Sequence, residues 1–256
     1  MPGASFDLSG TVGLVVGGAG GIGQTLATGL AAAGADIVIA DLPAQRGHAE
    51  EVAAAIRHTG RQVACLDLDI TAVASIEAMM VEAMARFGRL DWLVNSVGMN
   101  IRKPVLDYVE SDWDRMVAVN LKGAFFLTQA AARAMAPQGR GRIVHVASQL
   151  ATVAMHDRSI YAITKAGLAH LCRAFAVELA PHGLTFNSVG PTFVSTPLTT
   201  SMFGDAAFIA ENLPRIPAGR FGTTDDVLGA VHFLVSEAAA LVNGHLLLVD
   251  GGYTAW

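Results

Sequence analysis

Seven short apolar runs alternate along this chain with six longer segments of helical periodicity, and this alternation restricts the possible folds more than any other feature. The runs are rich in β-branched residues and hold few polar ones, as do strands that are covered on both faces. Strands that alternate with helices form βαβ units, whose right-handed crossovers put helices on both sides of a parallel sheet. The expected strands are 11–16, 36–40, 62–68, 90–95, 142–148, 184–189 and 245–250, and the expected helices are 23–33, 46–58, 73–87, 112–135, 159–180 and 224–236. The pattern therefore predicts an α/β protein with a Rossmann-type, doubly wound parallel sheet of seven strands.

Residues 1–256 are expected to form a single domain, because a chain of this length can bury one large core and no linker or repeat divides it. The least regular part is 190–222, which holds four prolines and is too long for an ordinary connection. We expect this segment to form a flap over a substrate.

Composition excludes several classes of protein. Hydrophobic residues make up 52% of the chain and charged residues 15%, which argues against disorder, and the net charge of -5 argues against a nucleic-acid binder. No apolar run is long enough to cross a membrane, and the first basic residue is Arg46. Cys65 and Cys172 lie in apolar patterns that suit buried thiols. We therefore expect a cytoplasmic protein with no metal site and no nucleic-acid or membrane partner.

The stretch VVGGAGGIG, 15–23, places five glycines between an expected strand and an expected helix. Two spacings typical of phosphate-binding turns overlap here, namely G-x-G-x-x-G at Gly18, Gly20 and Gly23 and G-x-x-x-G-x-G at Gly17, Gly21 and Gly23. Glycines let the backbone approach a pyrophosphate, whose charge meets the N-terminus of the following helix. A tight surface turn is the simpler alternative, but the strand before and the helix after favour a dinucleotide site.

An acidic residue ends the next strand. Asp41 is placed to accept hydrogen bonds from both hydroxyls of an adenosine ribose and to repel a 2′-phosphate. Leu42 supplies no cation to offset that repulsion, which favours NAD. Arg46 lies one turn further on and could support NADP, the less favoured alternative.

A second motif is Tyr161-Ala-Ile-Thr-Lys165, at the start of an expected helix. Residues four apart share a helix face, so the ammonium of Lys165 would stabilise a phenolate and lower the pKa of Tyr161. Ser148 ends the strand 142–148, at the edge where doubly wound sheets bind ligands. Asn120 lies within a helical segment, although asparagine is a poor helix former. Each feature alone also occurs on ordinary helix faces, whereas their combination favours a catalytic site.

Together these features resemble the short-chain dehydrogenase/reductase family along essentially the whole chain. The motifs that carry the resemblance are the glycine turn, Asp69-Ile70-Thr71, Asn95-Ser96-Val97-Gly98, Asn120, Ser148, Tyr161 with Lys165, and the run from Asn187 through Pro191 to Thr196. The resemblance implies hydride transfer between a substrate carbon and nicotinamide, with Tyr161 as the acid/base and Ser148 orienting the substrate oxygen. It implies that Lys165 lowers the pKa of Tyr161 and binds the nicotinamide ribose. Asn120 would hold a water that links Lys165 to solvent.

The resemblance also assigns the cofactor contacts. Asp69 and Ile70 would contact the adenine, Asn95 would line the adenosine side, and Val194 and Thr196 would fix the nicotinamide carboxamide. The residues expected to bind NAD are Gly17, Gly20, Gly21, Ile22, Gly23, Asp41, Leu42, Asp69, Ile70, Asn95, Gly98, Tyr161, Lys165, Pro191, Val194 and Thr196. No metal is implied, because the tyrosine and the serine polarise the substrate.

Three positions depart from the family pattern. Val16 stands where a threonine is usual and lacks a hydroxyl that ties neighbouring loops, so we expect a small loss of stability. Ser96 and Val97 replace the second and third residues of Asn-Asn-Ala-Gly. Thr192 replaces a glycine after Pro191 and should stiffen the start of the flap. None of these changes removes a reacting group.

The loop GMNIRKP, 98–104, is similar to that of gluconate 5-dehydrogenase-like members. Arg102 and Lys103 could bind a carboxylate there, or form a solvated basic pair. Between Ser148 and Tyr161 further polar residues follow, where a steroid or acyl-chain pocket would be apolar; they are Gln149, His156 and Arg158. We therefore expect a sugar acid, sugar or polyol as substrate, held by Ser148, Tyr161, Arg102, Gln149 and His156.

Two other functions remain open at this point. An NADPH-dependent 3-oxoacyl-thioester reductase is the alternative enzyme, although Asp41 and the acidic net charge count against it. A non-catalytic dinucleotide-binding sensor is the alternative of another class, although such proteins typically lose the tyrosine or lysine kept here. Family members are commonly tetramers that pair their last strands and pack helices equivalent to 112–135 and 159–180. We therefore expect a homotetramer, in which Trp256 could reach a neighbouring subunit.

Overall fold

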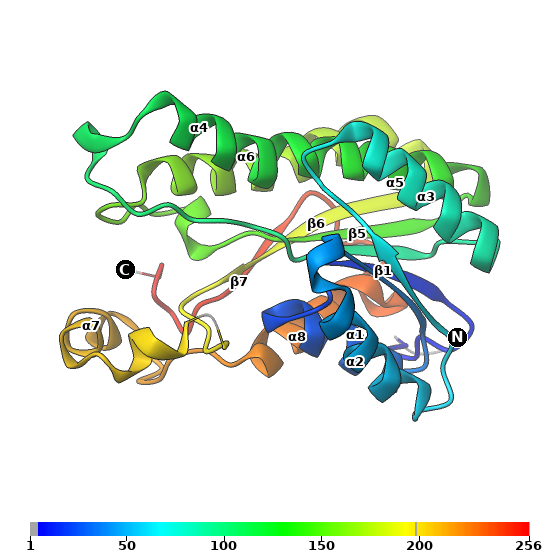
Figure 1. The fold of residues 1–256 in the computed structure, drawn as a ribbon, viewed down its shortest axis with the longest axis horizontal. Helices are drawn as coiled ribbons and strands as arrows, with labels where there is room; N and C mark the ends of the chain where they lie inside the picture. The colour runs from blue at the N-terminus through cyan, green and yellow to red at the C-terminus, as the bar shows by residue number, and fades with distance from the viewer. Residues whose placement is uncertain (1–4, 198, 256) are drawn as a thin grey trace.

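The computed structural model describes residues 5–197 and 199–255, and within them the chain forms one parallel sheet of seven strands (Figure 1). The strand order is β3-β2-β1-β4-β5-β6-β7. The strands are β1 (Val12–Val16), β2 (Asp36–Asp41), β3 (Val63–Asp67), β4 (Trp92–Asn95), β5 (Gly141–Val146), β6 (Leu184–Pro191) and β7 (Leu246–Val249). The predicted fold class is therefore confirmed, and each strand end lies within two residues of the prediction. Trp256 lies outside the described residues.

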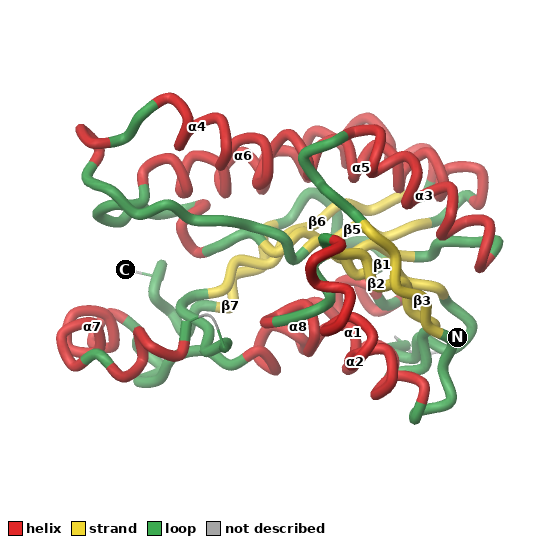
Figure 2. Tube along the Cα trace, viewed as in Figure 1, coloured by secondary structure: helices red, strands yellow, loops and turns green. Residues whose placement is uncertain are grey.

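Helices cover both faces of the sheet. The α-helices are α1 (Gly21–Ala32), α2 (Arg46–Arg57), α3 (Val73–Phe87), α4 (Glu110–Val117), α5 (Ala124–Met135), α6 (Ser159–Leu179), α7 (Ala206–Asn212) and α8 (Thr224–Val235). Figure 1 shows α3, α4, α5 and α6 over one face and α1, α2 and α8 over the other, with α7 set apart from both layers. Figure 2 shows the strands enclosed between these two helical layers. Within the described part of the chain, no helix is both long and apolar enough to cross a membrane.

Each helical layer buries its own apolar core against the sheet. Consecutive residues of β1 illustrate this, since Leu14 packs in the core beneath α3 and α5 while Val15 packs in the core beneath α1 and α8. Both side chains are fully buried. Burial on both faces explains why the strands are apolar at successive positions instead of alternating.

The carboxyl ends of the central strands lie level with one another. Val16 pairs with Ala40 on one side and with Asn95 on the other, so three loops begin at the same edge. The chain returns from β3 to the other side of β1 at this point, and such a reversal opens a crevice for a ligand. The glycine turn, Asp41 and the loop after β4 therefore meet there.

The predicted helix 112–135 is wrong in its middle, because the chain forms α4, a π-helical turn (Ala118–Gly123) and then α5. The side-chain amide of Asn120 is buried in this turn, where it forms hydrogen bonds with the backbone of Met99 and the hydroxyl of Thr164. Gly123 passes so close to α3's preceding loop that a Cβ would lie 2.5 Å from the carbonyl oxygen of Ile70. The widened turn accommodates both contacts.

The segment 190–222 contains the short helix α7 and an aromatic cluster of its own. Phe193 and Phe208 meet edge to face with their ring centroids 5.1 Å apart, and Phe203 and Phe221 lie 4.9 Å apart. A bridge between Val194 and Gly222 closes the base of the segment. The segment is thus a compact structured unit beside the carboxyl end of β6.

Candidate active site

The glycine turn uses its glycines for different reasons. Gly17 and Gly21 have φ of +79° and +55°, in the left-handed region that favours glycine. A Cβ on Gly23 would lie 2.0 Å from the carbonyl oxygen of Gly17, so this position permits no side chain. A Cβ on Gly20 would meet nothing within 4 Å. Gly20 precedes α1 and supplies no side-chain cap, so the first N–H groups of α1 are left for an anion.

The loop after β4 ties the glycine turn in place. The hydroxyl of Ser96 donates to the carbonyl oxygens of Val16 at 2.8 Å and Gly17 at 3.3 Å. The Ser96 hydroxyl therefore joins the loop after β4 to the glycine turn, a contact that the apolar side chain of Val16 cannot provide. The sequence alone did not reveal this contact, because it joins residues about 80 positions apart.

Asp41 is held beside the glycine turn. Its carboxylate accepts hydrogen bonds from the backbone N–H groups of Ala19 at 3.0 Å and Leu42 at 2.9 Å. Arg46, the residue that could have favoured NADP, forms an ion pair with Asp67 at 3.1 Å and donates to the carbonyl of Cys65. The guanidinium of Arg46 is thus already occupied by neighbours on β3.

A largely apolar cavity of about 160 Å3 lies next to Asp41. Its lining includes Leu42, Asp69 and Ile70, which were expected to contact the adenosine, together with Val97. Asp69 accepts from the N–H and the hydroxyl of Thr71, and these hydrogen bonds lower the pKa of the Asp69 carboxyl. The size and apolar walls of this cavity suit a planar ring such as adenine.

A second cavity, of about 520 Å3, brings most of the expected reacting groups together. Ser148, Tyr161 and Lys165 line it with Arg102 and Gln149. Val194 and Thr196, the expected contacts of the nicotinamide carboxamide, also line it. So do three other residues that were expected to bind the cofactor, Ile22, Gly98 and Pro191. The cavity thus runs from the glycine turn to the flap, as one site for a dinucleotide and a second molecule would.

Tyr161 and Lys165 lie one helical turn apart on α6. The Lys165 ammonium lies 5.6 Å from the centroid of the Tyr161 ring and donates to the carbonyl of Val146 at 2.8 Å. Burial lowers the pKa of Lys165 to about 8. Burial raises the pKa of Tyr161, while the Ser148 hydroxyl and the charge of Arg158 oppose that rise. The phenol therefore remains protonated at neutral pH until a further partner stabilises its anion.

Ser148 and Asn120 are both fixed by neighbours. The Ser148 oxygen accepts from the N–H of Leu150 at 3.1 Å, which leaves its own O–H free to donate. The buried amide of Asn120 accepts from Met99 N–H at 2.8 Å and donates to Met99 carbonyl at 2.9 Å. Asn120 thereby holds the start of the loop that carries Arg102.

His145 is a buried residue that sequence reasoning missed. Thr128 donates its hydroxyl to Ala124, so it must accept from Nε2–H of His145, at 2.8 Å. Nδ1 of the neutral ring then accepts from the amide of Asn95 at 3.3 Å. Burial, followed by the charge of Lys165, lowers the pKa of His145 to about 3, so the ring stays neutral.

Asn95 completes this buried chain of hydrogen bonds. Its Oδ1 accepts from the N–H of Val97 at 3.1 Å, which fixes the turn leading to Gly98. The Asn95 side chain is fully buried and lines neither cavity described above. Its contribution to the cofactor site is therefore to shape the loop, through contacts that the strand pattern could not show.

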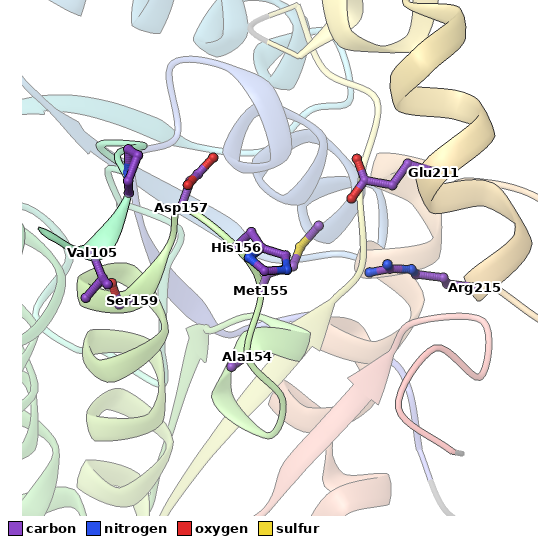
Figure 3. A pocket seen from close by; sticks show the side chains of 9 residues that line it. Val105, Ala154, Met155, His156, Asp157, Ser159, Glu211 and Arg215 are labelled. Carbon is purple, nitrogen blue, oxygen red and sulfur yellow. The ribbon is translucent and has the colours of Figure 1, made fainter. Parts of the chain in front are cut away.

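The structure separates His156 from the other expected substrate residues. His156 is exposed and lines a neighbouring cavity of about 610 Å3, with Glu211 and Arg215 reaching toward it from the segment around α7 (Figure 3). Met155 lines both cavities and forms the partition between them. On the inner side of that partition lies Arg158, which sequence analysis noted but did not assign to the substrate.

The residues present fit a dinucleotide and a polar second ligand. The N-terminus of α1 is uncapped and faces the open space at Gly20. Two buried polar atoms of residues that line the cavity around Tyr161 have no hydrogen-bond partner within the described residues, Oε1 of Gln149 and Oγ1 of Thr192. Buried polar atoms are nearly always paired, so unpaired ones on a cavity wall point to a polar ligand.

Comparisons with known proteins agree with this geometry. Residues 17–254 match a family model described as Enoyl-(Acyl carrier protein) reductase. The chain is 37% identical to 2-dehydro-3-deoxy-D-gluconate 5-dehydrogenase of Escherichia coli, over 98% of each chain. It is 39% identical to D-threitol dehydrogenase of Mycolicibacterium smegmatis, over 97% of this chain and 95% of that one. A crystal structure of gluconate 5-dehydrogenase from Burkholderia cenocepacia, in complex with NADP and tartrate, superposes with a TM-score of 0.93 at 37% identity over 98% of each chain.

Proposed function

The chain belongs to the short-chain dehydrogenase/reductase family of oxidoreductases, which act on CH–OH groups, and we propose that its substrate is a sugar acid, sugar or polyol and that it prefers NAD. The observation that carries the substrate class is the polar wall of the cavity around Tyr161. Arg102, Arg158 and the unpaired oxygen of Gln149 all line it. A hydrocarbon substrate would leave the guanidinium of Arg158 and the oxygen of Gln149 buried without partners, at a cost of about 1–3 kcal/mol each.

The proposed mechanism places the proton chemistry on Tyr161. Ser148 donates its free O–H to the substrate oxygen and holds it next to the phenol. In oxidation Tyr161 acts as the phenolate and takes the hydroxyl proton, and in reduction it acts as the phenol and gives its proton to the carbonyl oxygen. The Lys165 ammonium stabilises the phenolate that begins oxidation and ends reduction. When bound, nicotinamide supplies the carbon that accepts or gives the hydride. Gly98 leaves room next to the ammonium of Lys165, because a Cβ at this position would lie 3.1 Å from Nζ.

Asn120 has a proposed part in renewing the proton. The amide of Asn120 and the ammonium of Lys165 both lie close to Gly98. A Cβ on Gly98 would be 3.6 Å from Oδ1 of Asn120 and 3.1 Å from Nζ of Lys165. We expect a water held there to link Lys165 with solvent. The hydrogen bonds from Asn120 to the backbone of Met99 also hold the loop after β4 in place over the cavity.

The preference for NAD is supported by two contacts. The Asp41 carboxylate is anchored beside the glycine turn, where it could accept from the ribose hydroxyls, and it would repel a phosphate at the 2′-oxygen. The ion pair with Asp67 and the hydrogen bond to Cys65 direct the guanidinium of Arg46 toward β3. The gluconate 5-dehydrogenase from Burkholderia cenocepacia was crystallised with NADP, so cofactor use within these relatives has to be measured for each protein.

A homotetramer is also proposed. Apolar side chains are exposed on the outer helical layer, including Trp113 on α4, Phe125 on α5 and Val177 on α6. The edge strand β7 is apolar and only half-buried. Copies packed through these helices and paired along β7 would cover both surfaces, and the mass in solution, measured by light scattering, tests this.

The test of function is a turnover assay of the pure protein. Absorbance of reduced cofactor is followed with NAD or NADP and a panel of sugar acids, aldoses, polyols and simple secondary alcohols. Turnover with NAD on polar substrates supports the proposal, and Tyr161→Phe should abolish it while NAD binding stays near the wild-type value. Activity with NADPH on 3-oxoacyl thioesters alone would replace the proposed substrate and cofactor. Full activity of Tyr161→Phe would overturn the assignment of the base.

A further inference from the structure

Arg158 is a buried cation without an anionic partner. The residue is only 6% exposed, yet no Asp or Glu carboxylate among residues 5–197 and 199–255 comes within 4.0 Å of its guanidinium. Its one polar side-chain contact is from Nη1 to the sulfur of Met155, at 3.6 Å, which is a weak acceptor. Arginine is almost never buried unless it is paired. The guanidinium of Arg158 therefore has N–H donors without a strong acceptor on the wall of the cavity around Tyr161.

The neighbouring charges leave this need unmet. Burial lowers the pKa of Arg158 most, and the positive charge of Arg102 adds to that effect. The negative charges of Asp157 and Glu211 act only from beyond ion-pair distance. Figure 3 shows the Glu211 side chain pointing toward Met155 and His156, and Glu211 lines the outer cavity of about 610 Å3 but not the inner cavity of about 520 Å3. The inner cavity thus holds two guanidinium groups and no facing carboxylate among the described lining residues.

The two basic residues of the loop after β4 differ from Arg158. Lys103 is paired with Asp112, with 2.6 Å between Nζ and Oδ2, so it is not free for a ligand. Arg102 lines the cavity but is exposed to solvent. An exposed cation gains little from pairing because water already solvates it, whereas a buried one gains a charge-assisted bond at low dielectric.

We propose that Arg158 is the main receptor for a carboxylate on the substrate, with Arg102 as a secondary cation at the mouth of the same cavity. This inference rests on the proposed function, because it names the ionised group that the polar substrate carries. Arg158 lies three residues before Tyr161, at the start of α6. A carboxylate gripped there is fixed relative to the phenol by the helix, so the reacting hydroxyl is positioned with it. A neutral polyol could accept hydrogen bonds from the guanidinium but would bring no opposite charge to it.

The experiment compares two ligands that differ only in charge. Tartrate and threitol of matching configuration have the same two central hydroxyls, with carboxylates in one and hydroxymethyl groups in the other. Binding of each to the complex with NADH, in which neither ligand can be oxidised, is measured by calorimetry for wild type, Arg158→Gln and Arg102→Gln. We expect Arg158→Gln to weaken tartrate about 10-fold or more, and Arg102→Gln about threefold, with threitol changed less than about twofold by either.

Three results would overturn the proposal: wild-type binding of tartrate no tighter than of threitol, a loss in Arg158→Gln no larger than in Arg102→Gln, or equal losses for both ligands. Urea midpoints and NAD affinity report whether the variants fold. If Arg158→Gln does not fold, Arg158→Lys keeps the charge but loses the fork, and its loss must be larger for tartrate than for threitol. Because binding is measured without turnover, this outcome is separate from failure of the proposed reaction.

Discussion

Asp41 provides a quantitative test of how this site distinguishes its cofactors. Replacing Asp41 by Ala removes the carboxylate that accepts from Ala19 and Leu42, and leaves those N–H groups to water. Two effects then act on the ratio of kcat/KM for NAD to that for NADP. The ribose hydroxyls of NAD lose a charged acceptor, and the 2′-phosphate of NADP loses a repelling charge.

Both effects can be given a magnitude. A hydrogen bond to a charged group contributes about 1.5 kcal/mol. A phosphate monoester carries about −1.5 to −2 charges, and at about 5 Å from a half-exposed carboxylate, with an effective dielectric of about 40–80, the repulsion is about 1–3 kcal/mol. The sum of about 2.5–4.5 kcal/mol predicts that Asp41→Ala lowers the NAD/NADP ratio roughly 70- to 2,000-fold.

The assay is initial-rate kinetics with both cofactors at one saturating substrate concentration. Asp36→Ala is the matched control, because Asp36 begins the same strand and also accepts a backbone N–H, from Gln62. At about 16 Å from Asp41 along β2 it lies beyond the screening length at 0.1 M salt, so the ratio should stay within about twofold. A change of less than fivefold in Asp41→Ala, or an equal change in the control, would refute the reasoning.

Three further predictions concern stability and the cofactor cradle. Gly20→Ala should keep the wild-type urea midpoint but raise the Kd for NAD about 10-fold, because its methyl group would enter the open space next to α1. Gly23→Ala should lose about 3 kcal/mol or more of folding stability, because its Cβ would lie 2.0 Å from the carbonyl oxygen of Gly17. The pKa of His145 falls from 6.5 to about 3 on folding, so the unfolded state binds the extra proton between these values and stability drops as the pH falls below 6.5. From pH 7 to pH 5 the His145 share of this loss is about 2 kcal/mol, and urea unfolding of His145→Asn should lack it. Asp91→Ala should cost about 3 kcal/mol in urea unfolding, because the buried carboxylate pairs with both Arg89 and Arg140; catalysis by the folded variant should be unchanged.

The regular part of the fold was predictable because it depends on local pattern. Strands buried on both faces produce apolar runs, and β1 with Leu14 and Val15 in opposite cores is a direct example. The glycine turn and the Tyr161–Lys165 pair were predictable for the same reason, since each is a short motif whose spacing reflects one turn of backbone. Both lie where the pattern placed them.

The parts that were missed depend on contacts between distant segments. The π-helical turn at 118–123 accompanies the hydrogen bonds between Asn120 and Met99, which is 21 residues away. Helix propensity, which is a local property, could not predict this turn. The role of His145 was not predicted, because its partners Asn95 and Thr128 lie 50 and 17 residues away. His156 and Arg158 are two residues apart and equally polar in sequence. Only the position of Met155 between the cavities separates their surroundings.

The tie between Ser96 and the glycine turn has a consequence for how this chain can change through evolution. The hydroxyl that joins the two loops comes here from the β4 side, while the β1 side carries a valine. We expect a hydroxyl at either position to supply the tie, so that loss of one is tolerated while the other is present. Positions 16 and 96 should therefore be inherited as a pair, and a lineage that replaced Ser96 before regaining a hydroxyl at Val16 would pass through a loosened cofactor site.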